Sequence, residues 1–435
     1  MTPLPTLTIG GDGAAASPSA SGERHAAPWA GAPEAARRAA AVAAAHAEAD
    51  DEKGGFPARG LDALRKEGLL AAPLAPERGG LGLGTDPRTM HALYLALAEV
   101  GRGSLPLGRI WEGHVNALAL VEAYGTPEQK ERWGADARAG HLFGVWNTEI
   151  PREGVRYERE GASGVRVHGA KTFTTGGAYV TRPLVPGAMG GARQMAILAT
   201  DRLPVVSQPG WWRAEGMRAS RSGRTDFSDA LAPADSLLGE PDAYMCEPHF
   251  SGGAVRFAAV QLGGAEALAE AAAAHLAKLG RTDHPVHQIR LGEMATAVET
   301  GRLWLLGAAR LWARYAESQE AAAREDALRE DAPPEASGDG ASPDTPAPDA
   351  PEAVPAEAVC HYARMARSAI ERVCLDVLER ADRAVGARGL GQPGVLERTG
   401  RDLRLYLRQP DPDGALADAG ALAAQTPRPA RGADL

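Results

Sequence analysis

The pattern of apolar residues changes twice along the chain, and this double change constrains the fold more than any other feature. Up to about residue 140, apolar residues recur at the spacing of amphipathic helices, with Gly and Pro at the breaks. Between 141 and 240, short apolar segments alternate with Gly and Pro clusters, and helical spacing returns after 241. The sequence therefore predicts a mainly α protein: an N-terminal helical domain, a central antiparallel β-domain, and a C-terminal helical bundle.

The domain boundaries follow from these changes. The helical domain is expected at 31–140, the β-domain at 141–240 and the bundle at 241–420. Predicted helices lie at about 33–49, 56–70, 87–100, 110–124, 254–279, 286–315 and 356–385, and Gly125-Thr126-Pro127 caps a further one. Residues 1–30 and an acidic insertion at 317–355 are of low complexity and are predicted to be disordered, and residues 421–435 are predicted to form a C-terminal tail.

Charge and composition exclude several classes of function. The formal net charge of −9 argues against a polyanion-binding surface, so no nucleic-acid partner is expected. No apolar run reaches the ~18 residues that cross a bilayer, and the N-terminus lacks the pattern of a secretory signal. Cys246, Cys360 and Cys374 show neither disulfide nor metal-ligand spacing. We expect a cytoplasmic protein without a membrane span.

Several motifs, taken in order, resemble those of the acyl-CoA dehydrogenase family. They are FPARGLDALRKEGLLAAPLAPERGGLGLG (56–84), AYGTPEQKERW (123–133), FGVWNTE (143–149), HGAKTFTTGG (168–177), the stretch 216–241 and RDLRLY (401–406). The resemblance covers about 33–416 apart from the acidic insertion. It implies an FAD-dependent oxidoreductase that acts on an acyl-CoA or related small molecule. It also implies a homodimer or homotetramer, and an electron-transfer flavoprotein as a partner.

Two of these segments carry residues suited to a flavin. An isoalloxazine ring needs a flat wall on one face and hydrogen-bond donors at its edge. Thr148 and Thr175 offer hydroxyls, and Trp146 and Phe173 offer aromatic walls two residues away, on the same face if both segments are strands. Ordinary strand propensity would also supply such residues.

The resemblance assigns further roles within these segments. It places Thr148 at the pyrimidine edge of FAD and Thr175 near N5, with Phe173 in place of the usual Trp. Thr174 joins them as a cofactor-binding candidate. Arg281 stands as a remnant of the arginine that in the family reaches the FAD pyrophosphate of a neighbouring subunit.

The expected catalytic base is the main departure from the family. Family members carry out α,β-desaturation of an acyl thioester, in which a Glu removes the α-proton. In RDLRLYLRQPDPDGAL that position falls on Pro410, which has neither a carboxylate nor an N–H. A shift of one residue makes Asp411 the candidate base. Three hypotheses follow: an acyl-CoA dehydrogenase-like enzyme, a flavoprotein of the same fold with other chemistry such as monooxygenation, and a non-catalytic partner subunit.

Four other patterns have more ordinary readings. His284 and His287 have the spacing of a metal pair but no third ligand in view, so no metal site is predicted. The glycines at 79–84 follow no strand, which argues against a dinucleotide fingerprint. The arginines at 398, 401, 404 and 408 are typical of an acid-paired helix face. Glu149 is more often the structural partner of an arginine than a catalytic group.

Overall fold

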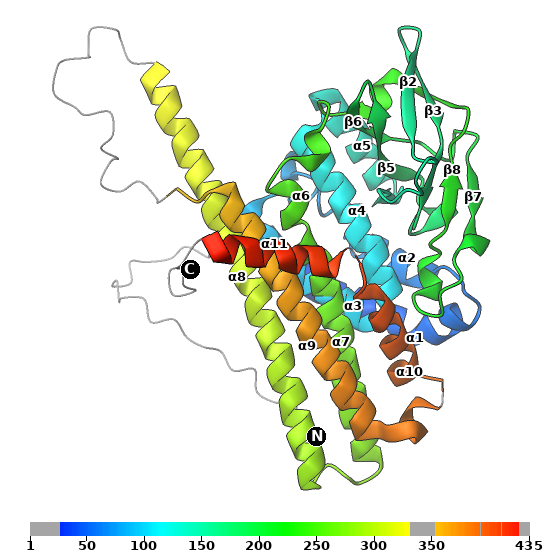
Figure 1. The fold of residues 1–435 in the computed structure, drawn as a ribbon, viewed down its shortest axis with the longest axis vertical. Coiled ribbons are helices and arrows are strands. Elements are labelled where there is room, and N and C mark those ends of the chain that lie inside the picture. Colours follow the sequence, from blue (N-terminus) through cyan, green and yellow to red (C-terminus); the bar gives the residue numbers. More distant parts are fainter. Residues whose placement is uncertain (1–26, 331–352, 392, 410, 426–435) are drawn as a thin grey trace, which may run out of the picture.

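The computed structural model describes residues 27–330, 353–391, 393–409 and 411–425. Its order is helical, β and helical, as the sequence predicts (Figure 1). The N-terminal helices are α1 Ala32–Glu52, α2 Ala58–Lys66, α3 Met90–Gly103, α4 Leu105–Tyr124 and α5 Pro127–Arg138. The C-terminal helices are α6 His249–Gly252, α7 Ala254–Lys278, α8 Pro285–Glu330, α9 Ala356–Leu390, α10 Val395–Tyr406 and α11 Pro412–Gln425. No helix in these ranges is both long and apolar enough to cross a membrane.

Local signals set the helix starts of the N-terminal domain. Thr126 caps α5: its hydroxyl accepts from the backbone N–H of Gln129, and the Gln129 side chain accepts from the N–H of Thr126. Helix α4 begins at Leu105, five residues before its predicted start. Ser104 caps it by accepting from Leu107 N at 3.4 Å, and Pro106 occupies the first turn, where its missing N–H costs nothing.

The β-domain consists of two sheets of short strands. The strands are β1 Phe143–Val145, β2 Arg156–Glu160, β3 Gly164–His168, β4 Ala170–Thr172, β5 Arg182–Met189, β6 Ala192–Ile197, β7 Val206–Gln208, β8 Arg224–Asp226, β9 Ala230–Pro233 and β10 Leu237–Leu238. The larger sheet has the order β10-β6-β5-β2-β3-β9, with β1 on β5, and the smaller has the order β4-β8-β7. Pairing is antiparallel except where β1 and β2 meet β5. The predicted antiparallel domain is therefore present with a minor parallel component.

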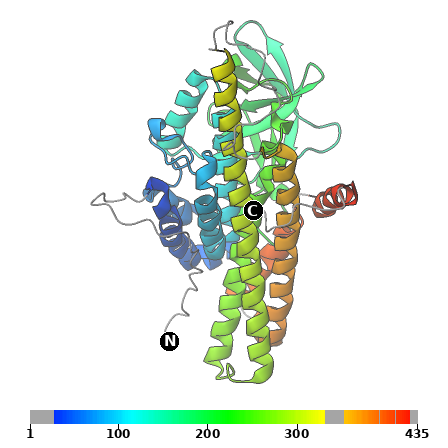
Figure 2. The ribbon, with the colours of Figure 1, turned by 90° about the vertical axis from the view of Figure 1, so that its left-hand side faces the viewer.

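The C-terminal bundle is longer than predicted. Helix α8 continues to Glu330 and runs along the long axis of the molecule, so residues 317–330 are helical and not part of a disordered insertion (Figure 2). Their Ala, Glu and Arg content favours a helix even without an apolar face. Likewise α11 reaches Gln425, inside the predicted tail, and residues 28–31 form a 3₁₀ turn. The rest of the predicted insertion, 331–352, lies outside the described residues.

Helices α3 and α7 cross with their backbones in contact. A Cβ on Gly263 of α7 would lie 1.9 Å from the carbonyl oxygen of Ala98, and a Cβ on Gly101 of α3 would lie 2.2 Å from that of Val260. Only glycine permits so close an approach. This crossing joins the N-terminal domain to the bundle.

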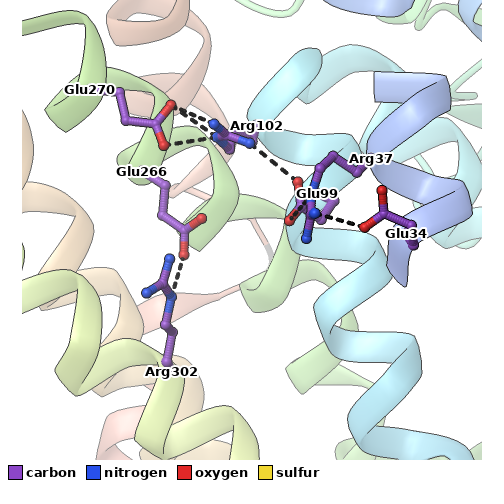
Figure 3. A network of polar contacts seen from close by, with 7 residues as sticks. All are labelled: Glu34, Arg37, Glu99, Arg102, Glu266, Glu270 and Arg302. Atoms are coloured by element: carbon purple, nitrogen blue, oxygen red, sulfur yellow. Dashed lines mark hydrogen bonds and ion pairs between the residues drawn. The ribbon is translucent and has the colours of Figure 1, made fainter. Parts of the chain in front are cut away.

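Ion pairs reinforce the same junction on its outer side (Figure 3). Arg102 of α3 bridges Glu99 at 3.3 Å and Glu270 of α7 at 2.9 Å, and Arg302 of α8 bonds Glu266 of α7 at 2.9 Å. Most of these groups are well exposed, where such pairs contribute less than about 1 kcal/mol each. Glu266 is the exception: burial raises its pKa, and the charge of Arg302 opposes that rise.

The β-domain docks onto α10 through a buried carboxylate. Asp402 is 2 % exposed and accepts a hydrogen bond from Met217 N at 2.5 Å. Beside it, Gly216 lies so close to α10 that a Cβ would be 2.6 Å from the carbonyl oxygen of Arg401. Burial raises the pKa of Asp402 to about 7, and the Met217 N–H opposes that rise.

Asp402→Asn should remove a pH dependence of stability. The pKa of Asp402 is raised above its ordinary value of 3.8, so between about pH 4 and 7 the folded protein holds a proton that the unfolded chain has released. Stability should therefore fall as pH rises through this window, by up to ~1.4 kcal/mol per pH unit. Asparagine keeps an acceptor for Met217 N but cannot ionise. Urea unfolding between pH 4.5 and 7.5 measures the slope. As a control, Asp418→Asn at an exposed position should keep that slope. If Asp402→Asn also kept it, Asp402 would not be the group that causes the pH dependence.

Candidate flavin and substrate site

The two segments predicted to hold a flavin lie side by side in the β-domain. The hydrogen bonds that join them include Trp146 Nε1 to Thr175 O at 3.0 Å, Thr172 N to Thr148 O at 2.9 Å, and Lys171 Nζ to Asn147 O at 3.1 Å. The segments come from the ends of β1 and β4, which belong to different sheets. The structure thus brings together residues 146–149 and 171–175 at the junction of the two sheets.

Trp146 does not form the predicted aromatic wall. Strand β1 ends at Val145, so the alternation that would place Trp146 and Thr148 on one face does not continue through them. The Trp146 ring is 2 % exposed, packs against Phe227 at 6.2 Å between ring centroids, and donates its N–H to Thr175 O. Trp146 therefore fixes the backbone of Thr175 from the buried side of the segment.

Phe173 faces outward, but for a different reason from the one predicted. Strand β4 ends at Thr172, and Phe173 has a φ of 53°, which turns the chain out of the sheet. Its ring is 39 % exposed and meets the rings of Trp211 and Trp212 edge-on at 5.2 and 5.7 Å. Two indoles therefore hold an accessible aromatic ring in place.

The hydroxyls differ in their availability. Thr148 is exposed, and Thr175 is half-buried with its Oγ1 3.4 Å from Ser222 Oγ. Thr174, by contrast, is fully buried, and its hydroxyl accepts from Thr225 Oγ1 at 3.0 Å, so its side chain is not presented to a ligand. Thr148, Phe173 and Thr175 thus offer two hydroxyls and an aromatic face, which fits the needs of a flavin ring.

Glu149 has a structural partner, as the sequence suggests, although the partner is a lysine. Its carboxylate pairs with Lys171 and accepts from Val155 N at 3.2 Å. Lys171 is fully buried, and burial lowers its pKa to about 8 while the bond to Glu149 opposes that fall. This pair locks β4 to the segment after β1.

Trp146→Phe should weaken flavin binding if this segment holds the ring. Phenylalanine keeps the packing against Phe227 but loses the N–H that fixes Thr175 O. If Thr175 is no longer held in position, its contact with the edge of the flavin ring should be lost. The Kd for FAD or FMN should then rise about tenfold, which corresponds to the free energy of one hydrogen bond. Flavin fluorescence titration measures it, with Trp111→Phe as the buried control on α4. Equal flavin affinity in the two variants would remove Trp146 from the site.

Asp411 and Arg281 do not join this arrangement. Asp411 is exposed, and its carboxylate accepts from Gly414 N at 3.1 Å, so it caps α11. Pro410, which aligns with the catalytic Glu of the family, lies outside the described residues. Arg281 is exposed in the turn between α7 and α8, at the opposite end of the molecule from the β-domain (Figure 1). Arg281 therefore lies apart from the two segments predicted to hold the ring.

Three of the four arginines predicted to form an acid-paired face have acidic partners. Arg401 and Arg404 of α10 pair with Asp51 at 2.7 Å and with Asp382, and Arg408, just after α10, pairs with Glu371. They line a cleft of about 580 Å³ between α10 and residues 214–216. Their charges are already compensated, which makes this cleft a poor phosphate site.

A buried ionic cluster lies on the other side of β1. Glu112 of α4 pairs with Arg109 one turn earlier, and its Oε1 lies 3.8 Å from Arg256 Nε of α7. Arg256 also donates from Nη2 to Asn116 Oδ1 at 2.6 Å. Glu112 and Arg256 are almost fully buried, whereas the Arg109 side chain is 23 % exposed. We call Arg109, Glu112, Asn116 and Arg256 the ionic cluster.

The ionic cluster adjoins the end of β1. A Cβ on Gly113 would lie 3.6 Å from Arg109 Nη1 and 3.8 Å from Val145 N, the residue before Trp146. Three buried tyrosines surround the cluster: Tyr94 of α3, Tyr244 of the 243–245 turn, and Tyr406 at the end of α10. Burial raises the pKa of all three, that of Tyr244 to about 12, so each remains a neutral hydroxyl.

The sequence contains a signal for this cluster that lies outside the family motifs. In LPLGRIWEGHVNALAL, Arg109, Glu112 and Asn116 stand at positions i, i+3 and i+7 of an otherwise apolar helix. That spacing places them on one face. A polar stripe on a helix buried on all sides indicates a paired or functional set of side chains.

Comparisons with known proteins agree with this architecture. Residues 32–141 match the family "Acyl-CoA dehydrogenase, N-terminal domain". "Probable acyl-CoA dehydrogenase YngJ" of Bacillus subtilis is 25 % identical over 287 residues, 62 % of this chain and 74 % of that protein. The dibenzothiophene monooxygenase of Mycolicibacterium goodii is 29 % identical over 214 residues, 45 % of this chain and 48 % of that protein. FMN-bound TdsC from Paenibacillus sp. A11-2, a dibenzothiophene monooxygenase, superposes with a TM-score of 0.73 at 22 % identity, covering 91 % of this chain and 97 % of that one.

Three helical and β parts in this order, with two linked segments at the sheet junction, define the acyl-CoA dehydrogenase fold. The matched N-terminal domain and the acyl-CoA dehydrogenases among the relatives agree with it. Residues 32–141 therefore carry the N-terminal domain of the acyl-CoA dehydrogenase family, and acyl-CoA dehydrogenases are among the relatives of the chain.

Proposed function

We propose that this chain is a flavin-dependent oxidoreductase whose reaction is an oxygenation and not the α,β-desaturation of an acyl thioester. One observation carries the choice of reaction: the interior beside β1 holds the ionic cluster, where an acyl chain would require an apolar lining. Both reactions occur among the relatives, which include acyl-CoA dehydrogenases and dibenzothiophene monooxygenases.

The candidate bases support the same choice. Desaturation needs a carboxylate that is free to reach the substrate α-carbon. Asp411 is exposed and caps α11, and Glu112 is held between Arg109 and Arg256. Each carboxylate is therefore held in place by partners within the fold. Oxygenation does not require such a base.

The residues of the chain have distinct roles in this proposal. Thr148 and Thr175 would hold the edge of a flavin ring and Phe173 would lie against its face, with Trp211 and Trp212 holding the Phe173 ring in place. Trp146 and Lys171 hold the two segments in register. A reduced flavin bound here supplies two electrons to O₂, so that one oxygen atom enters the substrate and the other leaves as water.

The type of flavin is part of the proposal. The family resemblance favours FAD, whereas TdsC has been solved with FMN. Thr148, Phe173 and Thr175 are assigned to the ring, which both flavins share. Separate titrations with FAD and FMN decide between them, and failure of both to bind would favour a non-catalytic partner subunit.

Anaerobic mixing with acyl-CoAs tests the reaction. We expect the oxidised flavin to keep its visible absorbance with butyryl-, octanoyl- and palmitoyl-CoA. With a flavin reductase, NADH and ¹⁸O₂, we expect one ¹⁸O atom in the product of an accepted substrate from a panel of small aromatic and carboxylate compounds. Bleaching by any of the acyl-CoAs would overturn the oxygenase assignment.

Asp411→Asn separates the two reactions further. Asparagine is as good a helix cap as aspartate, so we expect unchanged stability and unchanged oxygenation. If acyl-CoAs bleach the wild-type flavin and Asp411→Asn abolishes that bleaching, Asp411 is the base of a dehydrogenase and the proposal fails.

A further inference from the structure

The ionic cluster contains more positive than negative charge. Two guanidinium groups, Arg109 and Arg256, share the single carboxylate of Glu112, and a third, Arg193, lies 5.9 Å from the centroid of the Tyr244 ring. An unbalanced charge in the interior costs free energy unless a counter-ion compensates it. The cluster is accessible from outside at Arg109, whose side chain is partly exposed.

Three hydrogen-bonding atoms around the cluster have no partner within the described residues. They are Arg256 Nε, Tyr94 Oη and Tyr406 Oη, and all three residues are at most 5 % exposed. Arg256 Nε lies 3.8 Å from Glu112 Oε1, beyond hydrogen-bonding distance. All three atoms can donate. Buried donors without acceptors are rare in folded proteins and indicate a missing ligand or water.

The two observations concern the same place. The charge of Arg256 acts on the Tyr94 hydroxyl, and the charges of Arg109 and Glu112 act on the Tyr406 hydroxyl. The excess positive charge and the three hydrogen-bond donors without acceptors therefore favour the same kind of ligand, one with negative charge and several acceptor oxygens. Carboxylates and sulfonates have this chemistry.

We propose that the ionic cluster binds the oxyanion of the substrate, a carboxylate or sulfonate, with Arg256 and Tyr94 as specificity-determining residues. This assignment rests on the proposed function, since it names the substrate class of the same site. It predicts that compact anionic compounds are accepted, because the anion would lie in the interior beside β1.

Calorimetric titration of the flavin-loaded protein with benzoate, benzenesulfonate and benzamide tests the proposal. The three probes share a phenyl ring, and benzamide lacks the charge. We expect at least one anion to bind about tenfold or more tightly than benzamide, and the preferred anion to distinguish a carboxylate from a sulfonate site. Similar affinity for all three probes would overturn the proposal. Binding is read without turnover, so this outcome is distinct from acyl-CoA bleaching, which overturns the oxygenase assignment.

Two tyrosine variants make the test independent of folding. Tyr94→Phe removes a hydroxyl without a partner and should keep or raise the melting temperature, yet weaken binding of the anion about tenfold. Tyr157→Phe removes a buried hydroxyl that donates to Val185 O at 2.7 Å in the β-domain, and should lower the melting temperature without changing anion affinity. The same affinity in Tyr94→Phe as in the wild type would contradict the role of Tyr94.

Two arginine variants locate the anion. Arg256→Met should abolish the preference for anions over benzamide, whereas Arg404→Met, in the cleft beside α10, should leave it intact. The reverse result would place the anion at α10 and overturn the proposal.

Discussion

Gly263→Ala is expected to destabilise the protein by about 3 kcal/mol or more. The added methyl group would lie 1.9 Å from the carbonyl oxygen of Ala98, and both atoms belong to rigid helical backbone, so α3 and α7 must separate. Overpacking usually costs about 1–3 kcal/mol, and a clash with backbone belongs at the top of that range or above it. Urea unfolding at pH 7 measures the change.

A second glycine supplies the matched control. Gly292, on an exposed part of α8, has no atom within 4 Å of a built Cβ. Gly292→Ala should therefore stabilise the protein, by up to about 1 kcal/mol, through helix propensity alone. If both variants changed stability in the same direction, the close crossing of α3 and α7 would not be present in solution.

The clash at Gly263 should also affect the proposed anion site in the ionic cluster. Tyr94 and Gly101 stand two turns apart on α3, as do Arg256 and Gly263 on α7. Moving the two helices apart would separate Tyr94 from Arg256. A folded fraction of Gly263→Ala should consequently bind the anionic probes more weakly than the wild type.

Arg182→Met is expected to cost about 3–5 kcal/mol of stability. Arg182 opens β5 and is fully buried, and it bonds Asp136 of α5 at 2.5 Å, Asp201 at 2.6 Å and its neighbour's carbonyl at 2.7 Å. Removing it leaves two carboxylates close together without their cation, which is the costly way to break a buried pair. Chemical denaturation at pH 7 measures the loss.

The exposed Arg383–Glu379 pair on α9 is the control for Arg182. Both of its side chains are more than half exposed, so Arg383→Met should change stability by less than about 1 kcal/mol. The loss in Arg182→Met should also shrink at low pH, where protonation neutralises the stranded carboxylates. A loss of similar size in both variants would show that Arg182 does not anchor β5 to α5.

Most of the fold could be predicted because its signals are local. The start of α5 is set by Thr126, Pro127 and Gln129, which are neighbours in the sequence. The change from helical spacing to short apolar segments likewise marks the β-domain. The length of α8 was missed because residues 317–330 lack an apolar face. Their helical structure follows from the helix propensity of Ala, Glu and Arg, whereas the helices were predicted from apolar residues that recur at helical spacing.

The site was harder to predict because its geometry depends on where strands end. Trp146 and Thr148 were expected on one face of a continuous strand, but β1 already ends at Val145. Phe173 points outward because its backbone φ is 53°, and the spacing of apolar residues does not reveal such a backbone angle. The ionic cluster combines residues of α4 and α7 that are 140 or more positions apart. Its α4 half was visible as a polar stripe, and only the fold supplies Arg256.

The hydrogen bonds between residues 146–149 and 171–175 have a consequence for the thermodynamics of cofactor uptake. Since protein groups alone hold these segments to each other, the cofactor is not needed to order a loop as it binds, and the associated loss of conformational entropy is small. Uptake should then proceed in one kinetic phase with a rate proportional to flavin concentration. A slow unimolecular step would instead show that the segments rearrange around the ring.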